Sequence, residues 1–145
     1  MESSSTKETA RIAKEFAARI LKSKKTPVII GLSGNLGSGK TFFTRSFLAG
    51  IGVKEKITSP TFVIMREYML KRGVFKKAYH LDVYRLEPKD LKVLGFSRLL
   101  KEKHAIIIIE WAEKIKKLLP KKTIWIHFTH GKKENERIIS LSSRA

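Results

Sequence analysis

The stretch from Gly34 to Thr41 constrains the fold of this chain more than any other part of its sequence. It matches the pattern G-x-x-x-x-G-K-[ST] in full, in the order Gly34-Asn35-Leu36-Gly37-Ser38-Gly39-Lys40-Thr41. An apolar run over residues 28–32 precedes it, and an amphipathic run over about residues 40–49 follows it. A buried strand, a glycine-rich turn and a helix in this order are typical of a phosphate-binding loop. We therefore predict a P-loop NTPase fold of the α/β class.

Each residue type in this loop has a role in binding a nucleotide. Glycines let the backbone turn so that successive N–H groups point at phosphate oxygens, and the following helix adds its positive dipole end. We expect Lys40 to reach the β- and γ-phosphates and Thr41 to ligate Mg²⁺. The predicted nucleotide-binding residues here are Asn35, Leu36, Gly37, Ser38, Gly39, Lys40, Thr41 and Phe42. The implied cofactors are ATP and Mg²⁺.

Two acidic residues stand where a carboxylate can serve a bound nucleotide. Glu110 directly follows four isoleucines, at the expected end of a buried strand, which suits a carboxylate ligand of Mg²⁺. Asp82 lies in a largely apolar segment and can orient the attacking water or hold a metal-bound water. The alternatives are a solvated acid at position 110 and an ion pair of Asp82 with Arg85 or a lysine. The predicted catalytic residues are Lys40, Asp82 and Glu110, with Thr41, Glu110 and Asp82 at the metal.

Three further features near these acids have simpler interpretations. His80 is interpreted as a strand histidine with a satisfied side chain, and Trp111 as a packing residue. The hydroxyl-rich segment at residues 58–62 suits a loop that senses the γ-phosphate, and it equally suits a turn that enters a strand.

The rest of the sequence predicts one α/β domain over residues 1–145. Ser5 and Glu8 have the spacing of a capping box, and apolar residues continue at helical spacing to Leu21. Strands are expected over residues 61–70, 75–86, 105–109, 123–129 and 137–141, and a helix over residues 112–119. We expect a three-layer domain with a mixed sheet, parallel at its centre and extended by antiparallel hairpins.

Composition and charge narrow the setting in which the protein works. The chain has no cysteine, its longest unbroken apolar run covers residues 105–109, and its N-terminus lacks a signal-peptide pattern. We therefore expect a cytoplasmic protein that makes no membrane contact. The formal net charge of +18 attracts polyanions such as tRNA, although the same lysines also suit a solvated surface.

Four motifs in a fixed order resemble the TsaE (YjeE) family of bacterial P-loop ATPases. They are the loop at residues 34–41, Ser59-Pro60-Thr61-Phe62, the H-x-D-x-Y-R-L pattern at residues 80–86, and Ile109-Glu110-Trp111. The resemblance implies an ATPase that serves the synthesis of threonylcarbamoyladenosine in tRNA. It also implies TsaD-like and TsaB-like protein partners, with tRNA met through their complex.

The same resemblance implies roles for individual residues. Thr41 and Glu110 would bind Mg²⁺, and Asp82 would lie beside the reacting phosphate. Thr9 on the first helix and Arg137 near the C-terminus would contact the adenosine side of the nucleotide. Many relatives carry a short strand before the first helix, and this chain is expected to lack it.

Other functions stay open at this point. A small-molecule P-loop kinase needs an acceptor pocket and usually an arginine-bearing lid, whereas the arginines here are few and scattered. A nucleotide-gated module that binds RNA or protein needs only the loop and a basic surface. A GTPase is disfavoured because the sequence contains no Asn-Lys-x-Asp tetrapeptide.

Overall fold

A computed structural model describes residues 2–3, 5–23, 25–35, 37, 39–55, 65–133 and 136–143 of this chain. Strands and helices alternate from β1 to β3, and two strand hairpins, β3–β4 and β6–β7, are added to this α/β pattern. In chain order they are β1 (Glu2–Ser3), α1 (Thr6–Leu21), β2 (Val28–Gly34), α2 (Lys40–Gly50), β3 (Met65–Arg72), β4 (Phe75–Asp82), α3 (Pro88–Val93), α4 (Phe96–Leu99), β5 (Ala105–Glu110), the 3-10 helix η1 (Ala112–Leu118), β6 (Ile124–His130) and β7 (Arg137–Ser143).

The strands form one mixed sheet with the order β1-β7-β6-β2-β5-β4-β3. β2 pairs in parallel with both β5 and β6, and β5 pairs in parallel with β4. The outer pairs β3–β4, β6–β7 and β1–β7 are antiparallel. The prediction of a sheet that is parallel at its centre and antiparallel at its edges is therefore confirmed.

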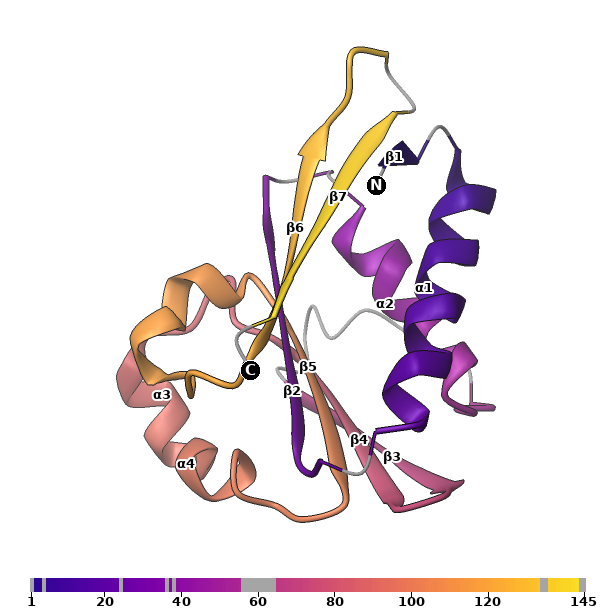
Figure 1. Ribbon diagram of the computed structural model, residues 1–145. Helices are drawn as coiled ribbons and strands as arrows, with labels where there is room; N and C mark the ends of the chain where they lie inside the picture. Colours follow the sequence, from indigo (N-terminus) through magenta and orange to yellow (C-terminus); the bar gives the residue numbers. More distant parts are fainter. Residues whose placement is uncertain are drawn as a thin grey trace.

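Helices cover both faces of this sheet, which gives the three predicted layers (Figure 1). Because strand side chains alternate between faces, β2 sends Ile30 into the core beneath α1 and α2, and Ile29 into the core beneath α3, α4 and η1. All six residues of β5 are buried, as expected for a strand covered on both sides. β2 and β5 therefore fix the centre of the fold, and their carboxyl ends carry the phosphate loop and Glu110.

The first helix begins where the capping pattern places it. The Ser5 side chain accepts a hydrogen bond from the Glu8 N–H at 3.2 Å, which satisfies a donor at the helix start. Phe16 on α1 packs against Phe43 and Phe47 on α2, with ring centroids 6.3 and 5.6 Å away. These contacts hold α2, the helix that follows the phosphate loop, against the core.

Three expectations about local structure need correction. The short first strand is present, because Glu2 and Ser3 pair with Ile138 and Arg137 of β7. So short a strand carries no pattern of its own, and the edge of β7 supplies its partners. The strand expected over residues 75–86 ends at Asp82, where a turn begins, and the expected helix over 112–119 is a 3-10 helix with non-helical backbone at Ile115. Residues 61–64 of another expected strand lie outside the described residues.

Among the helices that the structure describes, none combines the length and the apolar character needed to cross a bilayer.

Candidate functional site

The phosphate loop leaves the end of β2 and has a backbone that requires glycine. Gly37 and Gly39 have φ angles of +74° and +99°, in the left-handed region that side chains rarely adopt. A Cβ atom added at Gly37 would meet nothing within 4 Å, so conformation and not space selects glycine there. Such turns let consecutive N–H groups point to one side and bind an anion.

Lys40 is buried and turned back onto this loop. Its Nζ donates to the carbonyl oxygens of Gly34 and, at 3.0 Å, Asn35, and it lies 3.7 Å from the centroid of the Trp111 ring. Burial lowers the pKa of Lys40, while the negative charges of Glu113, Glu110 and Asp82 oppose that shift. The ammonium group is thus held inside the loop, at the position where a phosphate-binding cation is needed.

Glu110 connects the phosphate loop to the neighbouring strands. The residue is 1% exposed; Oε1 accepts from the Thr41 hydroxyl at 2.6 Å, and Oε2 from His80 Nε2 at 2.5 Å. Glu110 ends β5 and pairs in register with Leu32 of β2 and Asp82 of β4. The parallel register therefore places the two predicted metal carboxylates side by side at the carboxyl edge of the sheet.

Asp82 is half-buried and bonded to the backbone of the turn that follows β4. Its Oδ1 accepts from the Tyr84 N–H at 2.9 Å. Burial raises the pKa of Asp82, the hydrogen bond from Tyr84 lowers it, and the charge of Glu110 raises it further. Asp82 and Arg85, both within the described part of the chain, form no ion pair. The charge of the Asp82 carboxylate is therefore not neutralised by Arg85.

A pocket of about 230 Å³ opens at the phosphate loop beside Glu110, and we call it the phosphate-loop pocket; Asp82 is not among its lining residues. Its lining residues are Gly37, Gly39, Lys40, Thr41, Phe42, Glu110 and Trp111. The Thr41 hydroxyl and the Glu110 carboxylate offer hard oxygen ligands of the kind that Mg²⁺ prefers. The described residues contain no cluster of three or more His, Cys, Asp or Glu side chains built to hold a metal alone.

The remaining predicted nucleotide-binding residues lie at different distances from this pocket. Arg137 borders the loop, because a Cβ atom added at Gly39 would lie 3.9 Å from its Nε. Phe42 is partly exposed and lines the pocket. Thr9 is buried on α1, where its hydroxyl donates to the Ser5 carbonyl at 3.2 Å. Leu36, Ser38 and the segment 58–62 lie outside the described residues.

Three residues take part in the site in ways that the sequence did not indicate. Glu113 on η1 accepts from the Gly34 N–H at 3.0 Å and is the charge that most raises the pKa of Lys40. His80, predicted to be a satisfied strand histidine, bonds to Glu110 itself through Nε2, but its buried Nδ1 has no hydrogen-bond partner among the described residues. Trp111 covers Lys40, and its backbone adopts a left-handed φ of +62°, so it contributes to the pocket as well as to packing. The sequence signal that indicates this part of the site is the Glu110-Trp111 pair at the end of a buried strand.

Comparison with known proteins gives a consistent result. The family described as "Threonylcarbamoyl adenosine biosynthesis protein TsaE" matches residues 3–139. The tRNA threonylcarbamoyladenosine biosynthesis protein TsaE of Haemophilus influenzae is 36% identical over 122 residues, covering 83% of this chain and 75% of the relative. The protein of the same name from Bacillus subtilis is 38% identical over 119 residues, covering 82% and 70%.

A solved structure supports the same assignment at the level of the fold. The crystal structure of YdiB from Bacillus subtilis superposes with a TM-score of 0.71 at 31% sequence identity. The match covers 99% of this chain and 83% of that one. With the family match, the identities to curated relatives and the shared fold in agreement, this chain belongs to the TsaE family.

Proposed function

We propose that this protein is a Mg²⁺-dependent ATPase required for threonylcarbamoyladenosine modification of tRNA. The observation that carries the proposal is that Lys40, Thr41 and Glu110 line one pocket at the phosphate loop, where the Thr41 hydroxyl donates to Glu110. The names of its relatives support the tRNA-modification role, since they are called tRNA threonylcarbamoyladenosine biosynthesis proteins.

The proposed roles follow from the position of each group. Lys40 exchanges the loop carbonyls for phosphate oxygens when a nucleotide binds, and the backbone N–H groups of the loop bind the same anion. Thr41 and Glu110 hold Mg²⁺, which supplies charge neutralisation at the β- and γ-phosphates. His80 keeps the Glu110 carboxylate in place from the opposite side.

Asp82 is assigned to the chemical step, where it orients the attacking water beside the terminal phosphate. Its half-buried carboxylate lies next to Glu110 in the sheet and bonds to Tyr84 through Oδ1. The raised pKa that burial gives Asp82 makes it a better proton acceptor than an exposed aspartate. We assign Arg137 and Thr9 to the adenosine side, on the strength of the resemblance and, for Arg137, of its place beside Gly39.

The proposal includes partners and a compartment. The protein acts in the cytoplasm with a TsaD–TsaB-like threonylcarbamoyl transferase complex, and the nucleotide controls its engagement with that complex. tRNA modification is a multi-protein function in this proposal, so the ATPase alone does not transfer the carbamoyl group.

One set of phosphate-release assays separates this function from its rivals. ATP and Mg²⁺ are supplied with the protein alone, with its TsaD and TsaB homologues, and with small-molecule acceptors. We expect hydrolysis that depends on Mg²⁺ and changes when the homologues are added. Transfer of phosphate to an acceptor would make the protein a kinase, and absence of turnover in every mixture would leave a nucleotide-gated binding module. A pull-down of the homologues with and without ATP tests the partnership directly, and capture in neither state would reject it.

A further inference from the structure

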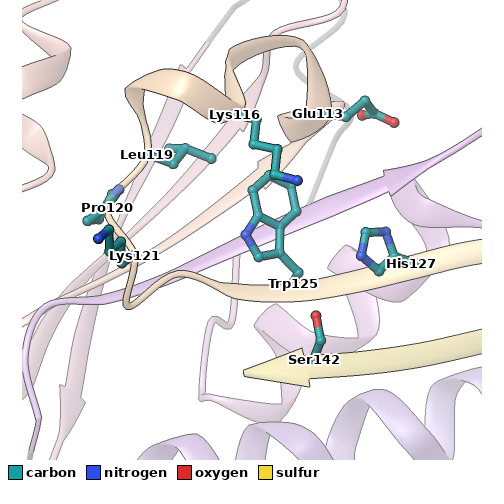
Figure 2. A pocket seen from close by; sticks show the side chains of 8 residues that line it. All are labelled: Glu113, Lys116, Leu119, Pro120, Lys121, Trp125, His127 and Ser142. Carbon is teal, nitrogen blue, oxygen red and sulfur yellow. The ribbon is translucent and has the colours of Figure 1, made fainter. Parts of the chain in front are cut away.

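A second pocket, larger than the phosphate-loop pocket, lies between η1 and the β6–β7 hairpin. It has a volume of about 340 Å³, and the residues that the argument uses are Glu113, Lys116, Lys121, Trp125, His127 and Ser142. We call it the β6–β7 pocket. In Figure 2, Trp125 and His127 rise from β6 and Ser142 from β7, while Lys116 reaches down from η1 toward the Trp125 ring. None of these residues has a role in the proposed ATPase except Glu113, which also bonds to the phosphate loop.

The floor of this pocket is a sheet face that η1 covers only in part: Trp125 is half-buried against the core beneath η1, whereas His127 and Ser142 are exposed. Trp125 stands directly opposite Ser142 in the antiparallel register, and His127 opposite Ser140, so these four side chains share one face. Ile126 and Phe128 alternate with them and are buried on the other face, beneath α1 and α2. This partly covered face therefore carries aromatic and hydroxyl groups, whereas a sheet face that awaits a packing helix carries aliphatic ones.

The two aromatic rings are stacked and held in place. The Trp125 and His127 rings are nearly parallel, with an interplanar angle of 7° and centroids 6.1 Å apart. Trp125 is fixed from below, because a Cβ atom added at Gly31 would lie 3.1 Å from its ring. His127 is fixed by a hydrogen bond between its Nδ1 and the Ser33 hydroxyl. A rigid pair of flat rings on a partly exposed sheet face is a surface on which a nucleic-acid base can stack.

The rim of the pocket is positively charged. Lys116 and Lys121 are exposed, and the Lys116 Nζ lies 6.0 Å from the centroid of the Trp125 ring. The single acid among the lining residues is Glu113, which accepts a hydrogen bond from the Gly34 N–H of the phosphate loop. The net charge of +18 extends this positive field over the whole molecule. Cations are thus placed within reach of the phosphates of a chain whose base lies against Trp125.

We propose that the β6–β7 pocket binds a single-stranded segment of RNA, with a base stacked on Trp125 and phosphates paired with Lys116 and Lys121. An acidic protein surface would pair with the lysines but would make no stacking contact with the parallel rings. RNA is the polyanion indicated by the relatives, which serve tRNA modification by name. Direct RNA contact by this chain goes beyond the proposed ATPase and does not depend on it.

The first test measures binding of a fluorescein-labelled oligouridylate of about ten nucleotides, within the usual site size for single strands. Anisotropy is followed across a salt series without ATP, so a failed ATPase leaves this result unaffected. The double variant Lys116→Gln/Lys121→Gln should lower the slope of log affinity against log salt by about 1.4, because each phosphate contact contributes about 0.7. The control, Lys14→Gln/Lys71→Gln, removes two exposed lysines elsewhere and loses the same charge. Equal slopes for both double variants would overturn the proposal.

The second test reads the stacking itself. The chain has two tryptophans, so in a Trp111→Phe background Trp125 is the only indole, and bound oligouridylate should quench its emission. Trp125→Leu should weaken binding about tenfold and Trp125→Phe less, as expected for one stacked base. Thermal unfolding shows whether Trp125→Leu folds, and if it does not, the quenching measurement decides. Saturating RNA that leaves Trp125 emission unchanged would reject the base-stacking site.

A competition experiment separates RNA from an acidic protein. Decaglutamate is titrated against the bound oligouridylate at physiological salt. It should compete weakly, because it offers charge without a ring to stack on Trp125. If decaglutamate competes as well as unlabelled oligouridylate does, the pocket recognises negative charge alone, and the proposal of an RNA site is wrong.

Discussion

The phosphate-loop pocket and the β6–β7 pocket meet at the end of β2 and are built from different kinds of groups. Around the first, Lys40 is 5% exposed, Glu110 is 1% exposed and His80 is 0% exposed. Around the second, Lys116, Lys121 and His127 are all exposed. Ser33 and Gly34, the last residues of β2, bond to His127 and Glu113 of the second pocket just before the chain enters the first.

This difference teaches what each pocket can do. Buried charges held by strand ends keep a fixed geometry in a low dielectric, which is what stabilisation of a developing charge requires. Exposed lysines around flat rings remain solvated at little cost in free energy. Their binding to a polyanion is favoured because it releases the counterions of the polyanion. The first pocket therefore suits chemistry, and the second suits binding that depends on salt.

The largest expected effect comes from Lys40→Ala. Loss of the one ammonium group held inside the loop should lower ATP hydrolysis about 10³-fold, the upper range for removing one charge-stabilising group. Phosphate release measured beside Lys14→Ala, an exposed lysine on α1, provides the control. RNA binding by the β6–β7 pocket should not change, and hydrolysis at the wild-type rate would break the comparison at its first step.

Asp82→Asn should lower turnover about 10²-fold while the dissociation constant of ATP changes only a few-fold. The amide keeps an oxygen that can accept from the Tyr84 N–H, but it can no longer accept a proton from water. A loss confined to turnover marks a group that acts in the transition state. Equal losses in turnover and affinity would instead give Asp82 a structural role in the turn after β4.

The parts of the site that sequence predicts are those encoded within one short segment. The glycine pattern specifies the loop, and a run of isoleucines before Glu110 places that carboxylate at the end of a buried strand. The parallel register that brings Asp82 beside Glu110 is not visible in either segment alone. The prediction for Asp82 rests instead on an acid within a largely apolar segment and on the resemblance to the TsaE family.

The parts that sequence missed depend on packing between distant segments. Glu113 bonds to the Gly34 N–H because η1 is a 3-10 helix that follows Trp111, whose backbone is in the left-handed conformation. No periodic pattern in the sequence predicts that geometry. β1 escapes detection because its two residues acquire strand structure only by pairing with β7. The β6–β7 pocket also requires knowing which face of the hairpin the helices leave partly exposed.

Glu110→Gln tests the metal assignment and should raise the Mg²⁺ concentration for half-maximal hydrolysis about 30-fold. The amide keeps an oxygen for Thr41 and for the metal but removes the charge. Glu67→Gln is the matched control, because Glu67 pairs with Lys77 on the surface of the β3–β4 hairpin. An unchanged Mg²⁺ titration with a folded protein would transfer the metal role to Asp82.

The smallest expected effect concerns Glu113, which lines the β6–β7 pocket and bonds to the phosphate loop at Gly34. Glu113→Gln keeps an oxygen that can accept from the Gly34 N–H and removes a negative charge beside two anion sites. Affinity for ATP and for oligouridylate should therefore both rise, by about two- to fivefold, as expected for one solvent-screened charge. Glu113→Ala removes the acceptor as well, and ATP affinity should fall about fivefold below that of Glu113→Gln.

The two variants of Glu113 together sharpen the comparison between the pockets. The hydrogen bond between the Gly34 N–H and residue 113 stabilises only the phosphate loop. ATP affinity should therefore differ between Glu113→Gln and Glu113→Ala, whereas RNA affinity should be the same in both variants, since both lose the same charge. Both affinities are measured on the same preparations by anisotropy, with labelled ATP and labelled oligouridylate. If Glu113→Gln weakens ATP binding as much as Glu113→Ala does, the carboxylate charge itself supports the loop, through its effect on Lys40. If RNA affinity is unchanged by both substitutions, the charge of Glu113 does not affect binding at the β6–β7 pocket. The two sites then meet at β2 without sharing a charge.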